Sequence, residues 1–219
     1  MITYEQIKND HAINTYIKKA DEALIALGYT EHSFAHVTKV ARHAGEILEK
    51  LGYPARTCEL AMIAGYLHDI GNLVNRVDHA QSGAMMAFRI LDHMGATAEE
   101  IAIITGAIGN HDEETAVAVN EVAAALILAD KTDVRSSRVR NPDNLKFDIH
   151  DRVNYSVKKS QTIINEDNSV IELSLAVDTE ISSVMDYFEI FIGRMILCRK
   201  AAEKLNLTFK LSINNQQLL

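Results

Sequence analysis

The chain has few cysteines, no long apolar run and no excess of basic residues, and each shortage excludes a class of protein. Its two cysteines, Cys58 and Cys198, stand far apart without CxxC spacing, so they give no zinc-finger or disulfide signal. No stretch reaches the roughly eighteen apolar residues of a membrane-spanning helix. The N-terminus carries acids and amides where a signal peptide has a basic and then an apolar run. We therefore expect a soluble, cytoplasmic protein.

The charge balance is acidic, and the basic residues are not clustered. With 22 Lys and Arg against 30 Asp and Glu, the formal net charge is −8 and the pI is about 5.6. Nucleic acid and membranes are therefore not expected as partners, because anionic partners attract positively charged surfaces. A small phosphorylated substrate stays compatible with this charge, since a bound metal ion can outweigh the general field locally.

The composition is that of an ordinary globular protein with a largely helical body. Of the 219 residues, 47% are hydrophobic and 24% are charged, which excludes disordered, collagen-like and coiled-coil classes. Apolar residues recur at three- and four-residue steps, with Ser33 and Asp78 as candidate N-caps, and this pattern predicts helices. We expect them over residues 4–27, 32–51, 55–67, 79–94, 97–110 and 120–138. The helix over 55–67 is apolar on most sides, so it is expected at the centre of the bundle, and the methionines, Met85 among them, are expected in the core.

The character of the sequence changes at residues 141–144, which read Asn-Pro-Asp-Asn. Beyond them we expect strands over 153–164 and 170–177 joined by a turn, then a helix over 179–205 and a closing strand over 207–213. The order β-β-α-β suggests a small antiparallel sheet covered by one helix. The predicted domains are therefore 1–140, a helical body, and 141–219, a small α+β subdomain.

The stretch AMIAGYLHDIG, residues 61–71, delivers His68 and Asp69 side by side at the end of an apolar run. Polar groups in an apolar setting need partners, and a metal ion is one such partner. Two further His-Asp dipeptides, which begin at His111 and His150, show that the pair alone is weak evidence.

Further histidines and an aspartate stand where predicted helices begin, end or turn polar: His36, His79, His111 and Asp130. A helical bundle can collect such positions into one site. Four or more His and carboxylate ligands suit one or two divalent transition ions such as Mn, Fe, Co or Ni, and do not suit Ca.

In this order, these residues resemble the ligand set of the HD-domain metal-dependent phosphohydrolases. The resemblance runs from about residue 32 to residue 140 and is carried by HVTKVARHAGEILEKLG, AGYLHDIG, DHAQSGAMMA, IGNHDE and LILADKTDVR. It implies a mainly α fold, an HD-type helical bundle, to which the α+β subdomain is appended. It also implies His36, His68, Asp69 and Asp130 as the four defining ligands, with His79 and His111 as the extra histidines of dinuclear branches.

The resemblance implies hydrolysis of a phosphate ester or anhydride of a small metabolite, with a nucleotide favoured. Asp69 and His68 are the expected catalytic pair, and Asp69 could bridge two metals or hold the attacking water. The basic residues Lys131, Arg135 and Arg138 follow Asp130 at helical steps and are candidates for phosphate binding. A solvated last turn of the helix explains these three equally well.

Two departures from the family pattern bear on this interpretation. Asn72 stands where many relatives have a lysine, so it is the candidate substrate contact at that position. No GYP motif follows, which disfavours the branch that cleaves cyclic dinucleotides. Two other functions stay open: a non-catalytic sensor that binds a nucleotide and a metal, and a dinuclear-iron oxygenase. The C-terminal subdomain is expected to serve as a lid, as a homodimer contact or as both, because a short sheet with open edges can pair with a copy of itself.

Overall fold

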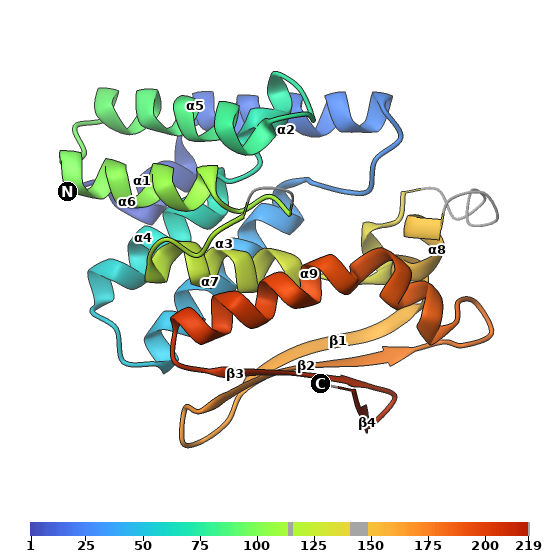
Figure 1. Cartoon of the computed structure of the whole chain (residues 1–219). Coiled ribbons are helices and arrows are strands. Elements are labelled where there is room, and N and C mark those ends of the chain that lie inside the picture. The colour runs from blue at the N-terminus through green and yellow to red at the C-terminus, as the bar shows by residue number, and fades with distance from the viewer. Residues whose placement is uncertain (114–115, 141–148, 219) are drawn as a thin grey trace. The chain divides into compact units, whose positions relative to one another are not determined.

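The computed structural model describes residues 1–113, 116–140 and 149–218. The chain divides into two units, Met1–Asp130 and Lys131–Leu219, of which the first is helical and the second holds a sheet (Figure 1). The expected fold class, a mainly helical HD-type body with a small C-terminal α+β part, is confirmed. The predicted domain boundary at residues 140 and 141 borders residues 141–148, which lie outside the described residues, and it stays a prediction.

The first unit is built from helices joined by short loops, and α5 and α6 run side by side in it (Figure 1). Its elements are α1 Tyr4–Asn9, α2 His11–Ala26, α3 Phe34–Lys50, α4 Ala55–Leu67, the 3-10 helix η1 Ile70–Leu73, α5 His79–His93, α6 Ala98–Gly109 and α7 Glu121–Lys131, which ends one residue beyond the unit. Ser33 caps α3 as expected, through a hydrogen bond that its side chain accepts from Ala35 N.

The single helix predicted over residues 4–27 is wrong, because Asp10 interrupts it. Asp10 adopts extended backbone angles, φ −73° and ψ 127°, and its side chain accepts a hydrogen bond from Ile13 N. A short polar side chain that caps a helix competes with helix continuation at its own position. The apolar spacing survives the break, since Ile7 and Ile13 are both buried, and for this reason periodicity alone could not reveal it.

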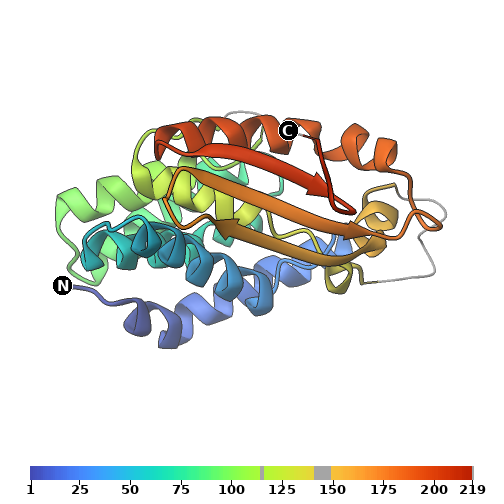
Figure 2. The same cartoon turned by 90° about the horizontal axis from the view of Figure 1, so that it is seen from below.

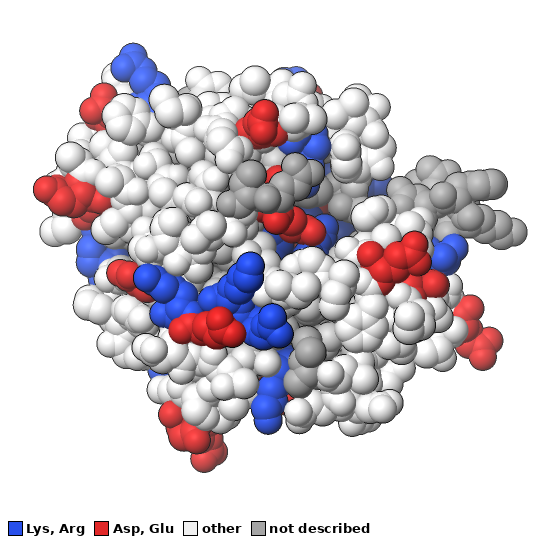
Figure 3. All heavy atoms as spheres, in the orientation of Figure 1, with Lys and Arg blue, Asp and Glu red and all other residues white. Residues whose placement is uncertain are grey.

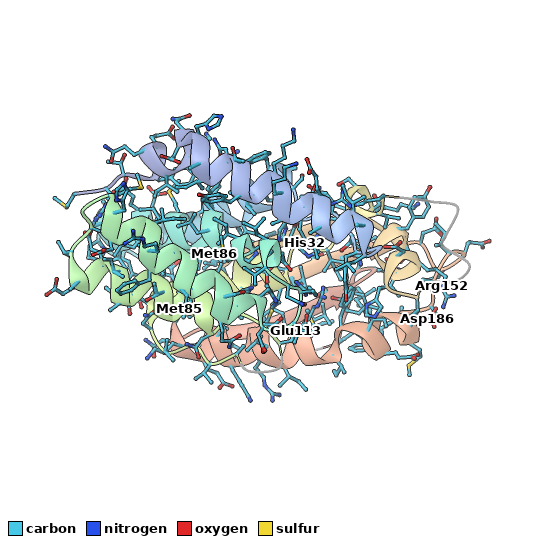
Figure 4. All side chains as sticks on the ribbon, turned by 90° about the horizontal axis from the view of Figure 1, so that it is seen from above. His32, Met85, Met86, Glu113, Arg152 and Asp186 are labelled. Carbon is cyan, nitrogen blue, oxygen red and sulfur yellow. The ribbon has the colours of Figure 1, made fainter. Side chains whose placement is uncertain are left out.

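Asp78 precedes α5 as predicted, but it does not cap the helix with its side chain. Its backbone is left-handed, with φ 56° and ψ 27°, and no side-chain cap hydrogen bond forms. The expected core role is also wrong for Met85, which lies on α5 (Figure 4) and is 68% exposed. Both predictions, the Asp78 cap and the buried Met85, relied on residue type alone, and the tertiary structure gave these residues other surroundings.

The centre of the first unit is the pair of helices α3 and α4, and their contact depends on Gly65. A Cβ atom at Gly65 would lie 2.7 Å from Ala41 Cα, so only a glycine lets the two helices approach this closely. As predicted, α4 is buried on most sides, Ala61 and Leu67 included. The close approach brings His68, which follows α4, next to His36 of α3. The ring centroids of His36 and His68 are 5.2 Å apart.

An ion pair links α4 to α6 in the first unit and predicts a pH dependence of stability. Arg56 Nε donates to Glu100 Oε1 at 2.7 Å, and this hydrogen bond lowers the pKa of Glu100. A carboxylate with a lowered pKa stabilises the fold above its ordinary pKa, and the stabilisation is lost as the pH falls through the lowered value. We expect Glu100→Gln to melt below the wild type at pH 7, with a difference that narrows in acid. The exposed neighbour Glu99, replaced by glutamine, should show no such difference, and equal melting of Glu100→Gln and wild type at pH 7 would contradict the idea.

The second unit contains a four-stranded sheet with α9 along it (Figures 1 and 2). Its elements are the 3-10 helix η2 Ser136–Arg138, α8 Ile149–Ser156, β1 Val157–Ile164, β2 Val170–Val177, α9 Val184–Lys204, β3 Thr208–Ile213 and β4 Gln216–Gln217. The strands follow the order β1-β2-β3-β4. The predicted hairpin is confirmed, since β1 and β2 pair antiparallel with Ile164 opposite Ile171.

Two strand predictions for the second unit are wrong. The strand predicted from residue 153 begins at Val157, because the preceding residues form α8, in which Asn154 Nδ2 donates to His150 O at 2.8 Å. The predicted all-antiparallel sheet is instead mixed, since β2 and β3 are parallel with Leu173 opposite Leu211. The 21 residues of α9 carry the chain back to the starting end of the sheet, and such a crossover makes neighbouring strands parallel. The N-terminal end of α9 is tied to α8, because Arg152 Nη2 lies 3.5 Å from Asp186 Oδ2 (Figure 4).

The helix predicted over residues 120–138 is also too long, since α7 ends at Lys131. Arg135 has an extended backbone, and Arg138 ends the separate 3-10 turn η2. Both arginines turn to Asp133: Arg135 Nε donates to its Oδ1 at 3.0 Å, and Arg138 Nη1 donates to its carbonyl oxygen at 3.1 Å. The assumption that these arginines share a helical face with Asp130 is therefore wrong.

The surface carries charges of both signs. On the face shown in Figure 3, Lys and Arg side chains lie among Asp and Glu side chains, and most of the face belongs to other residues. Within the described ranges, no helix combines the length and the apolar character needed to cross a membrane.

Candidate metal centre

The structure gathers the six predicted metal ligands at one place in the first unit. His36 comes from α3, His68 and Asp69 follow α4, and His79 begins α5. His111 follows α6, and Asp130 is the next-to-last residue of α7. Five of the six are buried and Asp130 is half-buried. We call these six residues the His/Asp cluster.

The two carboxylates of the cluster lie between the imidazole Nε2 atoms. Asp130 Oδ1 is 3.3 Å from His36 Nε2 and 3.7 Å from His68 Nε2. Asp69 Oδ2 is 3.6 Å from His36 Nε2 and 3.2 Å from His68 Nε2. The other oxygen of the same carboxylate, Asp69 Oδ1, is 3.5 Å from His79 Nε2. Asp69 therefore presents its two oxygens to two different groups of histidines, as a carboxylate that bridges two metal positions does.

Two overlapping triads in the cluster have ligand atoms close enough for one ion. The donor atoms of His36, His68 and Asp130 lie within 4.8 Å of one another, and so do those of His68, Asp69 and His111. The rings of His68 and His111 have centroids 5.0 Å apart, and those of His79 and His111 are 5.1 Å apart. The histidines thus form a continuous group with one or two places for a cation.

Three histidines of the cluster are held in the tautomer that a metal site requires. In each, Nδ1 lies at hydrogen-bond distance from the backbone carbonyl three residues earlier, which can only accept, so Nδ1 carries a proton and Nε2 is the nitrogen left to bind a metal. For His68 and His111 this arrangement follows from their positions just after α4 and α6, because the last carbonyl groups of a helix lack helical partners. For His79 the carbonyl belongs to the loop before α5. The contacts are His68 Nδ1 to Gly65 O at 2.8 Å, His79 Nδ1 to Arg76 O at 3.1 Å, and His111 Nδ1 to Ile108 O at 2.6 Å.

The electrostatics of the cluster also favour a bound cation. Burial lowers the pKa of His68, but the Asp69 and Asp130 carboxylates outweigh it and raise the pKa to about 10. Burial raises the pKa of Asp69, but His68, His32 and His79 outweigh it and hold that pKa well below its ordinary value. Among the residues that the structure describes, the buried atoms His68 Nε2 and Asp69 Oδ2 have no hydrogen-bond partner. A divalent ion would satisfy both atoms, so the residues present fit a transition metal.

Asn72, the departure from the family pattern, is buried and holds Asp69 in place. Its Nδ2 donates to Asp69 O at 2.9 Å and to Asp69 Oδ1 at 3.0 Å. Its Oδ1 accepts from Arg76 Nη1 at 3.4 Å. The structure thus places Asn72 beside the Asp69 carboxylate, where its hydrogen bonds fix the orientation of that side chain.

We expect Asn72→Ala to weaken metal binding by roughly 10- to 100-fold, because Asp69 loses the donor that orients it. Titration calorimetry with Mn²⁺ or Co²⁺ on chelator-treated protein measures the affinity. Asn75→Ala is the matched control, since Asn75 lies three residues further along the chain and its Oδ1 accepts from Val77 N at 2.9 Å. A metal affinity of Asn72→Ala equal to that of the control would contradict this role.

The predicted phosphate-binding residues Lys131, Arg135 and Arg138 belong to the second unit. Their role stays a prediction. Three residues of the first unit lie near the cluster: Tyr29, His32 and Arg76. Of these, sequence reasoning missed Tyr29 and Arg76. The ring of His32 (Figure 4) lies 5.6 Å from that of His36, and Arg76 Nη1 lies 3.3 Å from His79 Nε2. The available signal was the position of Arg76 in the sequence. It stands four residues after Asn72 and three residues before the cluster residue His79.

Comparison with known proteins found a relative, a solved structure and a family model that are similar to this chain. The uncharacterized protein MJ1020 of Methanocaldococcus jannaschii is 27% identical over 200 residues, which cover 81% of this chain and 76% of that protein. The crystal structure of a predicted HD superfamily hydrolase from an uncultured Thermotogales bacterium is 25% identical, with a TM-score of 0.43, and the match covers 62% of this chain and 75% of that one. The HD domain family model matches residues 33–135, a range that includes the whole His/Asp cluster. The predicted resemblance is therefore confirmed over residues 33–135, which match the HD domain family.

Proposed function

We propose that this protein is a metal-dependent phosphohydrolase that acts on a small phosphorylated metabolite, with a nucleotide as the favoured substrate. The observation that carries the proposal is the placement of Asp69, whose two carboxylate oxygens face His36 and His68 on one side and His79 on the other. The match to the HD domain family supports hydrolysis as the reaction class. The class of metabolite rests on the resemblance in the sequence.

The six residues of the cluster divide into two sets of three in this proposal. His36, His68 and Asp130 would hold one divalent ion, and Asp69 with His79 and His111 would hold a second. A bound transition ion supplies positive charge for the phosphoryl oxygens and makes water a better nucleophile at neutral pH.

The protein's own groups supply position. The Asp69 carboxylate can accept a hydrogen bond from an attacking water and so orient it. The Nδ1 contacts of His68, His79 and His111 with backbone carbonyls keep the ring orientations fixed. Asn72, through its bond to Asp69 Oδ1, prevents the carboxylate from rotating away. These contacts preorganise the site, which is what phosphoryl transfer chiefly requires from a protein.

The test begins with elemental analysis of the purified protein. Chelator-treated protein is then reloaded with Mn²⁺, Fe²⁺, Co²⁺ or Ni²⁺ and offered nucleoside mono-, di- and triphosphates beside other phosphate esters. The expected result is metal-dependent release of inorganic phosphate. Tight binding of a nucleotide without any turnover in metal-loaded protein would favour the sensor function instead. Oxygen consumption by iron-loaded protein without phosphate release would favour the oxygenase.

A further inference from the structure

Arg76 lies at the edge of the His/Asp cluster, in the loop between η1 and α5. Its Nη1 is 3.3 Å from His79 Nε2 and 3.4 Å from Asn72 Oδ1. Its Cζ lies 5.6 Å from the centroid of the Tyr29 ring. Arg76 is half-buried, so part of the guanidinium stays accessible from solvent. This group is thus a fixed positive charge in direct contact with a cluster histidine.

Arg76 differs from Arg56 and Arg135 because its contacts are not carboxylates. Arg56 pairs with Glu59 and Glu100, and Arg135 pairs with Asp133. Over the described residues, Arg76 forms no ion pair with a carboxylate; its contacts are an amide oxygen, an imidazole nitrogen and an aromatic face. A guanidinium carries five N–H donors in a planar fork, and these contacts leave most of them for another acceptor.

We propose that Arg76 binds the phosphate of the substrate, with Tyr29 and Asn72 as the residues that position it. The inference rests on the proposed function, since it names the group that would grip the substrate of that site. A guanidinium fork matches phosphate geometry and forms two parallel charge-assisted hydrogen bonds with it. The Tyr29 ring supports the guanidinium by a cation–π contact, which limits its freedom before the phosphate arrives.

The contact between Arg76 and His79 links phosphate binding to the metal. His79 Nδ1 contacts a carbonyl, so its Nε2 lone pair is the acceptor of the Arg76 N–H. That lone pair can serve either the guanidinium or a metal ion, but not both. When His79 serves a metal, Arg76 loses one acceptor and becomes available to an anion, while Asn72 Oδ1 still anchors it.

Asn72 contacts both Asp69 and Arg76. Its amide nitrogen holds Asp69 Oδ1, and its amide oxygen accepts from Arg76. The group that would bind the metal and the group that would bind the phosphate are therefore set by one buried side chain. A substrate with a terminal phosphate is favoured, because its oxygens can reach the metal position and the guanidinium at the same time.

The experiment measures binding of inorganic phosphate to metal-loaded full-length protein by titration calorimetry, with the metal content determined for each variant. We expect Arg76→Ala to weaken phosphate binding by roughly 10- to 100-fold, the effect of losing charge-assisted hydrogen bonds, with no loss of metal. Arg76→Lys keeps the charge without the fork, so it should recover part of the affinity. Arg42→Ala is the matched control, because Arg42 is an arginine of the same unit whose side chain is 68% exposed and pairs with Glu46 at 3.9 Å.

Unchanged phosphate affinity in Arg76→Ala overturns the inference, and so does the absence of phosphate binding in the wild type. A loss of affinity that accompanies an equal loss of metal, in both Arg76→Ala and Arg76→Lys, overturns it too, because the residue would then act on the metal site alone. The proposed function fails separately. Wild-type protein that binds phosphate through Arg76 but hydrolyses no ester would keep the inference and reject hydrolysis.

Discussion

Replacement of Asp69 by asparagine is expected to abolish metal-dependent hydrolysis and to weaken metal binding by roughly 100-fold or more. The change keeps the shape of the side chain but removes its negative charge. It also turns one oxygen into an N–H₂ donor, which would face either the His36 and His68 nitrogens or His79 Nε2. In either orientation one side of the cluster loses its bridging ligand atom. Calorimetric titration with the metal and assay of phosphate release measure the two effects.

The control for this experiment is Asp112→Asn. Asp112 follows His111 as Asp69 follows His68, so the two replacements alter the same dipeptide in two places. Of these two dipeptides, only His68-Asp69 places its aspartate within the six-residue cluster, so Asp112→Asn should keep both metal affinity and activity. Full activity in Asp69→Asn, at normal metal content, would contradict both the bridging role of Asp69 and the proposed mechanism.

Replacement of Gly71 by alanine is expected to destabilise the first unit by about 3 kcal/mol and to disturb the position of His79. A Cβ atom at Gly71 would lie 2.0 Å from His79 O, 2.5 Å from Gly83 N and 2.7 Å from Ser82 Oγ. Two of these atoms belong to the backbone of α5, which cannot move without moving the first turn of that helix. Urea denaturation followed by circular dichroism gives the change in the free energy of unfolding.

Gly106→Ala provides the opposite expectation in the same unit. A Cβ atom at Gly106 would lie 3.9 Å from Val119 Cγ2, an ordinary contact, and the residue lies inside α6. This replacement should stabilise the protein by about 0.5–1 kcal/mol, because alanine restricts the unfolded chain more than glycine does. If Gly71→Ala were as stable as Gly106→Ala, the close approach of η1 and α5 at Gly71 would not require a glycine, and the expected destabilisation would be wrong.

The sequence was informative wherever a local pattern and the tertiary fold agree. The helices α3 and α4 and the hairpin of β1 and β2 have periodicity, caps and turn residues that point to one structure, and these predictions are confirmed. Predictions of helix boundaries were wrong where a capping or ion-pairing side chain competed with continuation of the helix. Asp10 caps α2 and so divides a helix whose apolar spacing is continuous. Residues beyond Lys131 continue to look helical, yet Asp133 draws Arg135 and Arg138 into a loop.

The sequence by itself determined the types of residue that can hold a metal, their order and the helix ends on which they stand, because helix boundaries and side-chain chemistry are local properties. It therefore sufficed to nominate all six members of the His/Asp cluster and to predict the family. Only the tertiary structure decided which atoms face one another. Three features depend on close packing between elements: the two-sided placement of Asp69, the support from Asn72 and the contact of Arg76 with His79. The close contacts are those of α4 with α3 at Gly65 and of η1 with α5 at Gly71. Such close approaches involve residues far apart in the chain, and no spacing along one helix specifies them.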